Sequence, residues 1–190
     1  GIPYIRSKPL KVANPRTPDQ VHQRNKMTPS MDFLRANILM VRSGFRFYKT
    51  KRSAFNAALS YTLLHGFPGE GLEIDHSKVL LSRGELEKPL EGKFLAGEHE
   101  VVVTWDGQNF SGNAKASDRA MIAVYDPENQ ESLVVLRGCR RSDGAQGQKI
   151  ALPDTFNRTS WKVYLAFNAA DESLVSDSVL CEEITDLPVS

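Results

Sequence analysis

The residues that could do chemistry are spread thinly along the chain. The four histidines lie at four separate places, and none has another histidine three or four residues away, as a local zinc site would need. Asp75, His76 and Ser77 are the three residue types of a catalytic triad. A triad is an arrangement in space, however, and neighbours on a strand point to opposite faces. We therefore interpret these three residues as the polar start of a strand.

Carboxylate pairs and glycines do not mark an active site either. Glu98 with Glu100, and Glu182 with Glu183, are typical of solvated strand edges. The glycines from residue 107 to residue 147 fall between predicted strands, and never between a strand and a helix, where a phosphate cradle forms. The sequence thus predicts no catalytic residue, no metal site and no cofactor, and it favours a non-enzymatic protein.

The sharpest candidate for binding is RSGFRFYKTKR at residues 42–52, where cations alternate with aromatic rings. Bases stack on aromatic side chains while cations follow phosphates, so this composition suits nucleic acid. The alternative, which we favour, is a helix C-terminus with cations at the negative end of the dipole. The candidate interaction residues, for self-association, a protein partner or nucleic acid, are Arg6, Lys8, Arg16, Arg24, Arg42, Arg46, Tyr48, Lys49 and Arg52.

Trp105 and Trp161 are the residues that could serve a surface glycan-binding module, since exposed aromatic rings can stack on sugars. Trp105 is in phase with Val101 and Val103, and Trp161 is in phase with Val163. This alternation predicts that both tryptophans lie in a core. A glycan-binding module would need at least one of them exposed.

The first third of the chain reads as an arm followed by helices. Pro3, Pro9 and Pro15 predict an extended arm over residues 1–16. Thr17 is the expected N-cap of the first helix, with Pro18 at its first position and Gln20 three residues after the cap.

Further helices follow from apolar spacing. An amphipathic stripe follows at spacings of three or four residues and comprises Met31, Leu34, Ile38, Val41 and Phe45. Thr28-Pro29 predicts a kink or a fresh helix start upstream of the stripe. Another helix is expected over residues 53–65, ending at Gly66.

From residue 72 the apolar period changes to two. Short strands are predicted at residues 79–82, 101–105, 121–125, 133–136, 148–152, 161–167 and 179–184. Seven short strands without intervening helices predict a β-sandwich of immunoglobulin or fibronectin type III kind. The fold class is therefore α+β, with an extended arm and helices over residues 1–72 and the sandwich over residues 73–190.

The charge distribution also divides the chain at residue 72. Residues 1–72 hold 12 Lys and Arg against 3 Asp and Glu, a net charge of +9, and residues 73–190 hold 12 against 20, a net charge of −8. Such halves can attract each other within or between chains, or the basic half can meet an acidic partner.

Cysteine usage and hydropathy exclude two classes of protein. Cys139 and Cys181 are too few for a disulfide scaffold; they could form one bridge, but two buried thiols on strands are favoured. In the first half, the longest uncharged apolar run is about six residues, against roughly 18 for a membrane span. No membrane span is expected.

Six blocks follow one another along the chain: IRSKP (5–9), NPRTPDQVHQR (14–24), AFNAALSY (54–61), IDHSKVLLSRG (74–84), GNAKASDRAMIAVYDP (112–127) and YLAFNAADESLVSDSV (164–179). In this order they resemble an uncharacterised family of Bacteroidetes proteins. The resemblance implies a trimmed N-terminus and a first helix without interruption. Residues 5–24 are also similar to prophage-encoded proteins. We therefore expect a structural or adhesive component of a phage-like or cell-surface assembly, with a cytoplasmic or virion-like location favoured.

Overall fold

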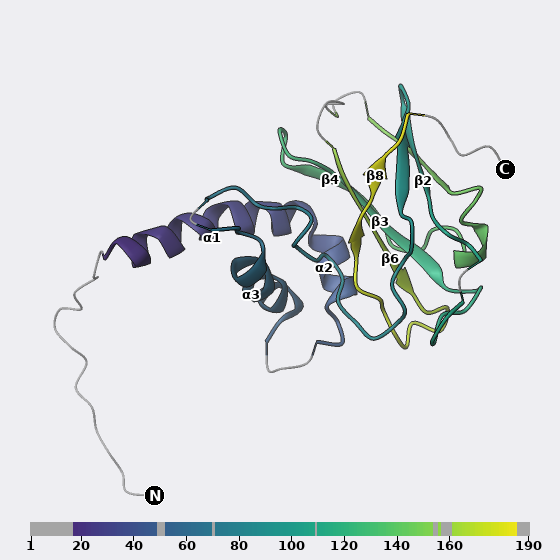
Figure 1. Cartoon of the computed structure of the whole chain (residues 1–190), viewed down its shortest axis with the longest axis horizontal. Helices are drawn as coiled ribbons and strands as arrows, with labels where there is room; N and C mark the ends of the chain where they lie inside the picture. The colour runs from purple at the N-terminus through teal and green to yellow at the C-terminus, as the bar shows by residue number, and fades with distance from the viewer. Residues whose placement is uncertain are drawn as a thin grey trace, which may run out of the picture.

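The computed structural model describes residues 17–48, 52–69, 71–108, 110–153, 156 and 161–185. The predicted arm at residues 1–16, and with it Arg6, Lys8 and Arg16, lies outside the described residues, as does Lys49. Within the described ranges the chain is an α+β protein, as the sequence predicts. Three helices precede two sheets of four strands each (Figure 1).

The first helix, α1 (Pro18–Ala36), begins as the sequence predicts. Thr17 is the N-cap, Pro18 is the first helical residue, and the Thr17 hydroxyl accepts a hydrogen bond from the Gln20 amide at 3.4 Å. The fresh helix start predicted near Pro29 is wrong, because α1 continues through that residue. Proline removes one bond to the carbonyl of Asn25, which is exposed and can therefore bond water instead.

The helix break falls at Asn37, between α1 and α2 (Ile38–Gly44). The apolar stripe is thus divided between two helices. Asn37 is fully buried; its amide nitrogen donates to the Phe33 carbonyl at 2.9 Å, and its oxygen accepts from the Ser132 hydroxyl at 2.7 Å. This side chain bridges the end of α1 to the sheet below. The predicted helix after Ser53 is confirmed as α3 (Ala54–His65), with Gly66 as its C-cap.

The strands form two sheets with the orders β5-β2-β1-β8 and β4-β3-β6-β7. Neighbours are antiparallel except β1 and β8, which are parallel. The strands are β1 (Lys93–Ala96), β2 (Glu100–Thr104), β3 (Arg119–Asp126), β4 (Glu131–Val135), β5 (Gln148–Ala151), β6 (Lys162–Asn168), β7 (Val179–Leu180) and β8 (Glu182–Glu183). A short 3-10 turn, η1 (Arg141–Asp143), precedes β5.

Two strand predictions fail and one strand is missed. Residues 79–82 are not a strand. This stretch lies beside the residue that precedes β7, since the Ser178 hydroxyl accepts a hydrogen bond from the Leu81 amide at 2.9 Å. The strand predicted at residues 179–184 is divided at Cys181, with β7 in one sheet and β8 in the other. The strand β1 was not predicted; its sequence, KFLA, does not alternate between apolar and polar residues.

Two hydrophobic clusters hold these layers together. One lies between the sheets and includes Trp105, Ile122, Leu165 and Phe167. The other lies between the opposite face of the β4-β3-β6-β7 sheet and the helices, and includes Phe33, Leu34, Val41, Met121 and Tyr164. Alternate residues of β3 and β6 therefore enter different clusters, so this sheet is buried on both faces. We call the three helices the helical cap and the two sheets the sandwich.

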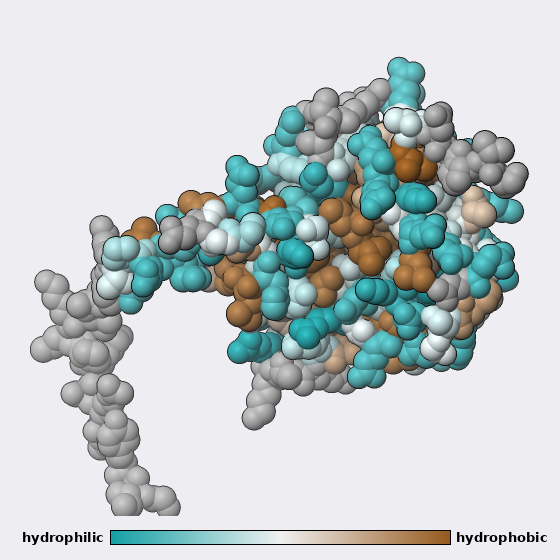
Figure 2. Space-filling model, viewed as in Figure 1, coloured by the Kyte–Doolittle hydropathy of each residue, from teal (hydrophilic) through white to brown (hydrophobic). Residues whose placement is uncertain are grey.

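The surface of the molecule is mostly hydrophilic in the view of Figure 2, with apolar patches over the helical cap and over the middle of the face. The division at residue 72 stays a prediction, although the helices and the sheet share one cluster. Among the described residues, no helix has the length and apolar character needed to cross a membrane.

The two thiols are not bonded to each other. Cys181 is buried between β7 and β8, and Cys139 is partly buried in a loop instead of on a strand.

Candidate functional site

The predicted interaction residues do not form one continuous surface. Arg24 and Arg42 lie exposed on α1 and α2. Arg46 is partly buried and hydrogen-bonded: its guanidinium donates to the Asn168 side-chain oxygen at 2.8 Å and to the Glu172 carbonyl at 2.7 Å. Burial lowers the pKa of Arg46, and Glu172 opposes that shift. Arg46 therefore ties the end of α2 to the turn after β6.

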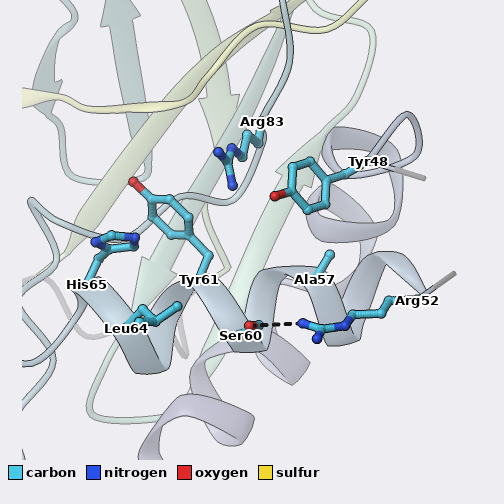
Figure 3. Close-up of a pocket in the computed structure, with 8 residues that line it drawn as sticks. All are labelled: Tyr48, Arg52, Ala57, Ser60, Tyr61, Leu64, His65 and Arg83. Atoms are coloured by element: carbon cyan, nitrogen blue, oxygen red, sulfur yellow. Dashed lines mark hydrogen bonds between the residues drawn. The ribbon is translucent and has the colours of Figure 1, made fainter. Parts of the chain in front are cut away.

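Two of the predicted residues, Tyr48 and Arg52, line a cleft on the helical cap. The cleft has a volume of about 310 Å³. We call it the basic cleft, and Figure 3 shows its lining: Tyr48, Arg52, Ala57, Ser60, Tyr61, Leu64, His65 and Arg83. None of these side chains is acidic.

Arg83 forms the centre of the basic cleft. Its guanidinium lies over the ring of Tyr48, 4.6 Å from the centroid, and over the ring of Tyr61, 5.2 Å from the centroid. Figure 3 shows the guanidinium between the two rings, pointing toward α3. Cation–π contacts of this kind contribute roughly 0.5–1 kcal/mol each at exposed sites. The two rings hold the planar group in one orientation.

A close backbone contact places Arg83 in this position. The Arg83 amide donates to the carbonyl of Gly44, the last residue of α2, at 3.1 Å. A Cβ atom on Gly44 would lie 2.5 Å from the Cα of Ser82, closer than real Cβ contacts occur. Glycine at the end of α2 is thus what lets the loop at residues 81–84 pass beside the helix and present Arg83 to α3.

The helix α3 supplies the other wall. Ser53 caps its first turn by accepting from the Asn56 amide at 3.2 Å. Arg52 precedes the cap, and its side chain extends along α3 and donates to the Ser60 hydroxyl at 3.2 Å (Figure 3). Tyr61 and His65 are one helical turn apart, and their rings lie 4.4 Å apart. Leu64 stands at the rim with 74% of its surface exposed.

The electrostatic character of the basic cleft follows from what its cations contact. Within the described part of the chain, neither Arg52 nor Arg83 has a carboxylate within ion-pair distance. The contrast is Arg141, whose buried guanidinium lies 3.2 Å from the Asp118 carboxylate. Two positive charges in one cleft, with no counter-charge among the described residues, favour an anion there.

An adjoining cavity of about 530 Å³ shares Tyr48 and Arg83 with the basic cleft. Its other lining residues include the acidic Glu85 and Asp177 and the apolar Phe47. Arg83 therefore lies between two cavities. The basic cleft, toward α3, has no acidic residue among its described lining residues, and the adjoining cavity, toward the β6-β7 turn, has two.

Sequence reasoning identified Tyr48 and Arg52 but missed Tyr61, His65 and Arg83. Arg83 is 31 positions from Arg52 and follows a stretch that was predicted to be a strand. Only the spacing of Tyr61 and His65, which puts them on one helix face, was visible in the sequence.

The triad-like residues do not form a triad. The Ser77 hydroxyl donates to Asp75 at 2.6 Å, while His76 turns the other way and lies 2.8 Å, through Nδ1, from the hydroxyl of Tyr164. They occupy a turn, so the predicted strand start is wrong. Among the described residues, no group of three or more His, Cys, Asp or Glu side chains could hold a metal ion.

The tryptophan prediction is confirmed. Trp105 is 4% exposed and Trp161 is 6% exposed, and both belong to the cluster between the sheets. The Trp105 indole also donates to the Arg141 carbonyl at 2.8 Å. Neither ring can serve as the exposed platform that the glycan-binding hypothesis requires.

The fold and the cleft define the class of the molecule: an α+β protein in which a basic cleft lies on a helical cap over one face of a two-sheet sandwich. The chain belongs to a family of unknown function (DUF6266), whose model matches residues 1–181. A comparison with curated proteins gave no match.

Proposed function

We propose that this protein is a non-enzymatic structural or adhesive component of a phage-like or cell-surface assembly. The helical cap attaches it to the next subunit, and the sandwich is the rigid module that it displays. The observation that carries the proposal is the joint core of cap and sheet. Phe33 and Val41 of the cap pack with Met121 and Tyr164 of the sheet, so a force on the cap is transmitted to the sandwich.

Charge complementarity supports attachment between copies of this chain. Residues 1–72 carry a net charge of +9 and residues 73–190 a net charge of −8. A head-to-tail contact places the basic segment of one copy on the acidic sandwich of the next, and such heterologous contacts extend into rings or filaments. The resemblance of residues 5–24 to prophage-encoded proteins, and of the chain to an uncharacterised family of Bacteroidetes proteins, supports the same setting.

We infer further that the sandwich is of immunoglobulin or fibronectin type III kind. The support is the strand order: β5, β2 and β1, with β8 added parallel to β1, form one sheet, and β4, β3, β6 and β7 form the other. The seven strands other than β8 pair antiparallel, and two sheets with this exchange of strands are typical of such sandwiches. An experimental structure whose strands fail to superpose on such a domain would refute this inference.

Light scattering tests the assembly role directly. We expect the mass of the full chain to rise with protein concentration and to fall toward that of a monomer as salt screens the charges. Arg24→Glu combined with Arg42→Glu weakens the association. Lys88→Glu is the matched control, since it reverses an exposed cation of the acidic segment and leaves association unchanged or stronger. A strict monomer at every concentration and salt refutes self-assembly.

A second candidate, single-stranded nucleic acid binding, is favoured by one observation. The basic cleft combines two guanidinium groups with the rings of Tyr48 and Tyr61, and cations with aromatic rings are the usual elements of single-strand sites. It predicts an affinity that falls steeply with salt and is lost in the triple variant Arg46→Ala, Lys49→Ala and Arg52→Ala. Binding that is absent, or insensitive to salt, removes this candidate.

A further inference from the structure

We propose that the basic cleft is a binding site for a small molecule that carries a carboxylate or a phosphate group, held by Arg83 and Arg52. This inference goes beyond the assembly role and does not depend on it, since the described lining of the cleft comes from one copy of the chain. Its basis is the position of the two guanidinium groups, the absence of acidic side chains from the described lining residues, and the size of the cavity.

The first argument concerns the unsatisfied donors of Arg83. Its guanidinium carbon lies over the rings of Tyr48 and Tyr61, so the edge of N–H donors that points away from these rings is left for a ligand. Among the described residues, no side chain or carbonyl accepts a hydrogen bond from that edge. A planar fork with a fixed orientation fits carboxylate and phosphate oxygens in pairs, and little side-chain freedom is lost when it binds.

The second argument concerns Arg52 and its surroundings. One of its terminal nitrogens donates to Ser60, which fixes the side chain along α3 and leaves further donors unused. The phenol groups of Tyr48 and Tyr61 make no hydrogen bond with the described residues and offer two more donors. An anion in the basic cleft would therefore meet two positive charges and several donors at once, which is the usual composition of an oxyanion site.

The third argument sets the side of Arg83 on which the anion lies. The adjoining cavity is lined by Glu85 and Asp177, whose charges repel an anion. None of the described lining residues on the α3 side carries a carboxylate, and Ala57 and Leu64 supply an apolar wall there. We expect the charged group to lie between Arg83 and Arg52, with the uncharged part of the ligand toward Leu64. A volume of about 310 Å³ admits a small molecule.

The experiment is a calorimetric titration of the full chain with inorganic phosphate and, separately, with succinate. Each is compared with sodium chloride at the same ionic strength. The protein concentration is one at which light scattering shows a monomer, so that anion binding is measured apart from assembly. We expect saturable binding with a dissociation constant on the order of 1 mM or tighter. The stronger of the two probes identifies the ligand as a phosphate or a carboxylate compound.

Matched variants locate the site. Arg52→Gln and Arg83→Gln should each weaken binding at least 10-fold, whereas Arg42→Gln, the same change on an exposed arginine outside the cleft, should leave it unchanged. Arg52 is exposed, so its variant tests the site even if Arg83→Gln folds poorly. Equal heats from chloride, or equal loss of binding in Arg42→Gln, overturns the inference. Self-association that persists while neither probe binds refutes the anion site alone, and the converse refutes the assembly role alone.

Discussion

Protonation of His76 should make the fold sensitive to mild acid. The imidazole lies under α1, with Nδ1 2.8 Å from the Tyr164 hydroxyl and its ring against those of Phe33 and Tyr125, at centroid distances of 5.3 and 5.8 Å. Tyr164 is completely buried. A charged imidazolium in this position would lose most of its hydration, and the neutral ring is therefore the stable form.

Burial is the main reason that the pKa of His76 falls from 6.5 to about 4, with a smaller contribution from the positive charge of Lys162. Asp75 opposes the shift. Asp32 of α1 and Glu73 of the loop that precedes His76 line the same cavity as His76, Tyr125 and Lys162.

The sign of the effect on stability follows from this depressed pKa. Between pH 6.5 and about 4 the unfolded chain binds a proton at this residue that the folded chain does not, so the free energy of unfolding decreases as the pH falls through that range. Above pH 6.5 neither state is protonated, and below pH 4 both are, so the contribution is constant outside the window. The full shift corresponds to about 3 kcal/mol, and partial solvent access reduces the expected loss to roughly 2 kcal/mol.

Urea unfolding at pH 7.0 and pH 4.5 measures this loss. The variant His76→Gln cannot take up the proton, and its side-chain amide can form a hydrogen bond with the Tyr164 hydroxyl. The stability difference between the two pH values should therefore be smaller in His76→Gln than in the wild type by roughly 2 kcal/mol. Comparing differences removes any loss that the substitution causes at both pH values. An equal pH dependence in the two proteins would refute the reasoning.

Three further predictions concern the contacts between the layers. Asn37→Ala removes the bridge to Phe33 and Ser132 and should lower the free energy of unfolding by about 2–3 kcal/mol in urea titrations, because it leaves buried polar groups unpaired; a change below 0.5 kcal/mol would contradict this. Gly44→Ala should cost about 1–3 kcal/mol and also weaken anion binding in calorimetry, because the new Cβ displaces the loop that carries Arg83; unchanged binding would separate the loop from the site. Arg141→Met should cost about 3–5 kcal/mol in thermal or urea unfolding, because it leaves Asp118 buried and charged, and the second change Asp118→Leu should restore much of that loss; no recovery would refute the pairing.

The parts of the fold that the sequence predicts depend on near neighbours in the chain. Thr17 caps α1 through an amide three residues away, and Ser53 does the same for α3. The alternation in β6 likewise needs only its own seven residues. Local rules of capping and period are sufficient in these cases.

The predictions that fail depend on contacts between distant segments. The break at Asn37 is fixed by Ser132, 95 positions away, and the polar contacts of residues 81 and 82 come from Ser178. The alternation around residues 179–184 is real, but it cannot show that the chain changes sheets at Cys181. Tertiary contacts determine these features, and single-sequence patterns do not contain them.

The basic cleft contains residues that local sequence patterns indicate and residues that contacts between distant segments position. Only the first kind was predicted. Arg52 and Tyr48 stood out because cations and aromatic rings are dense in residues 42–52. That density by itself did not distinguish the engaged Arg46, which bonds Asn168, from Arg52, which has no carboxylate partner among the described residues. Arg46 is set apart by its bonds to Asn168 and Glu172, whereas the loop at residues 81–84 passes Gly44 and brings the guanidinium of Arg83 over α3. Composition therefore picked out part of the proposed binding site, while the tight contact at Gly44 supplies the cation that lies far from that segment in the sequence.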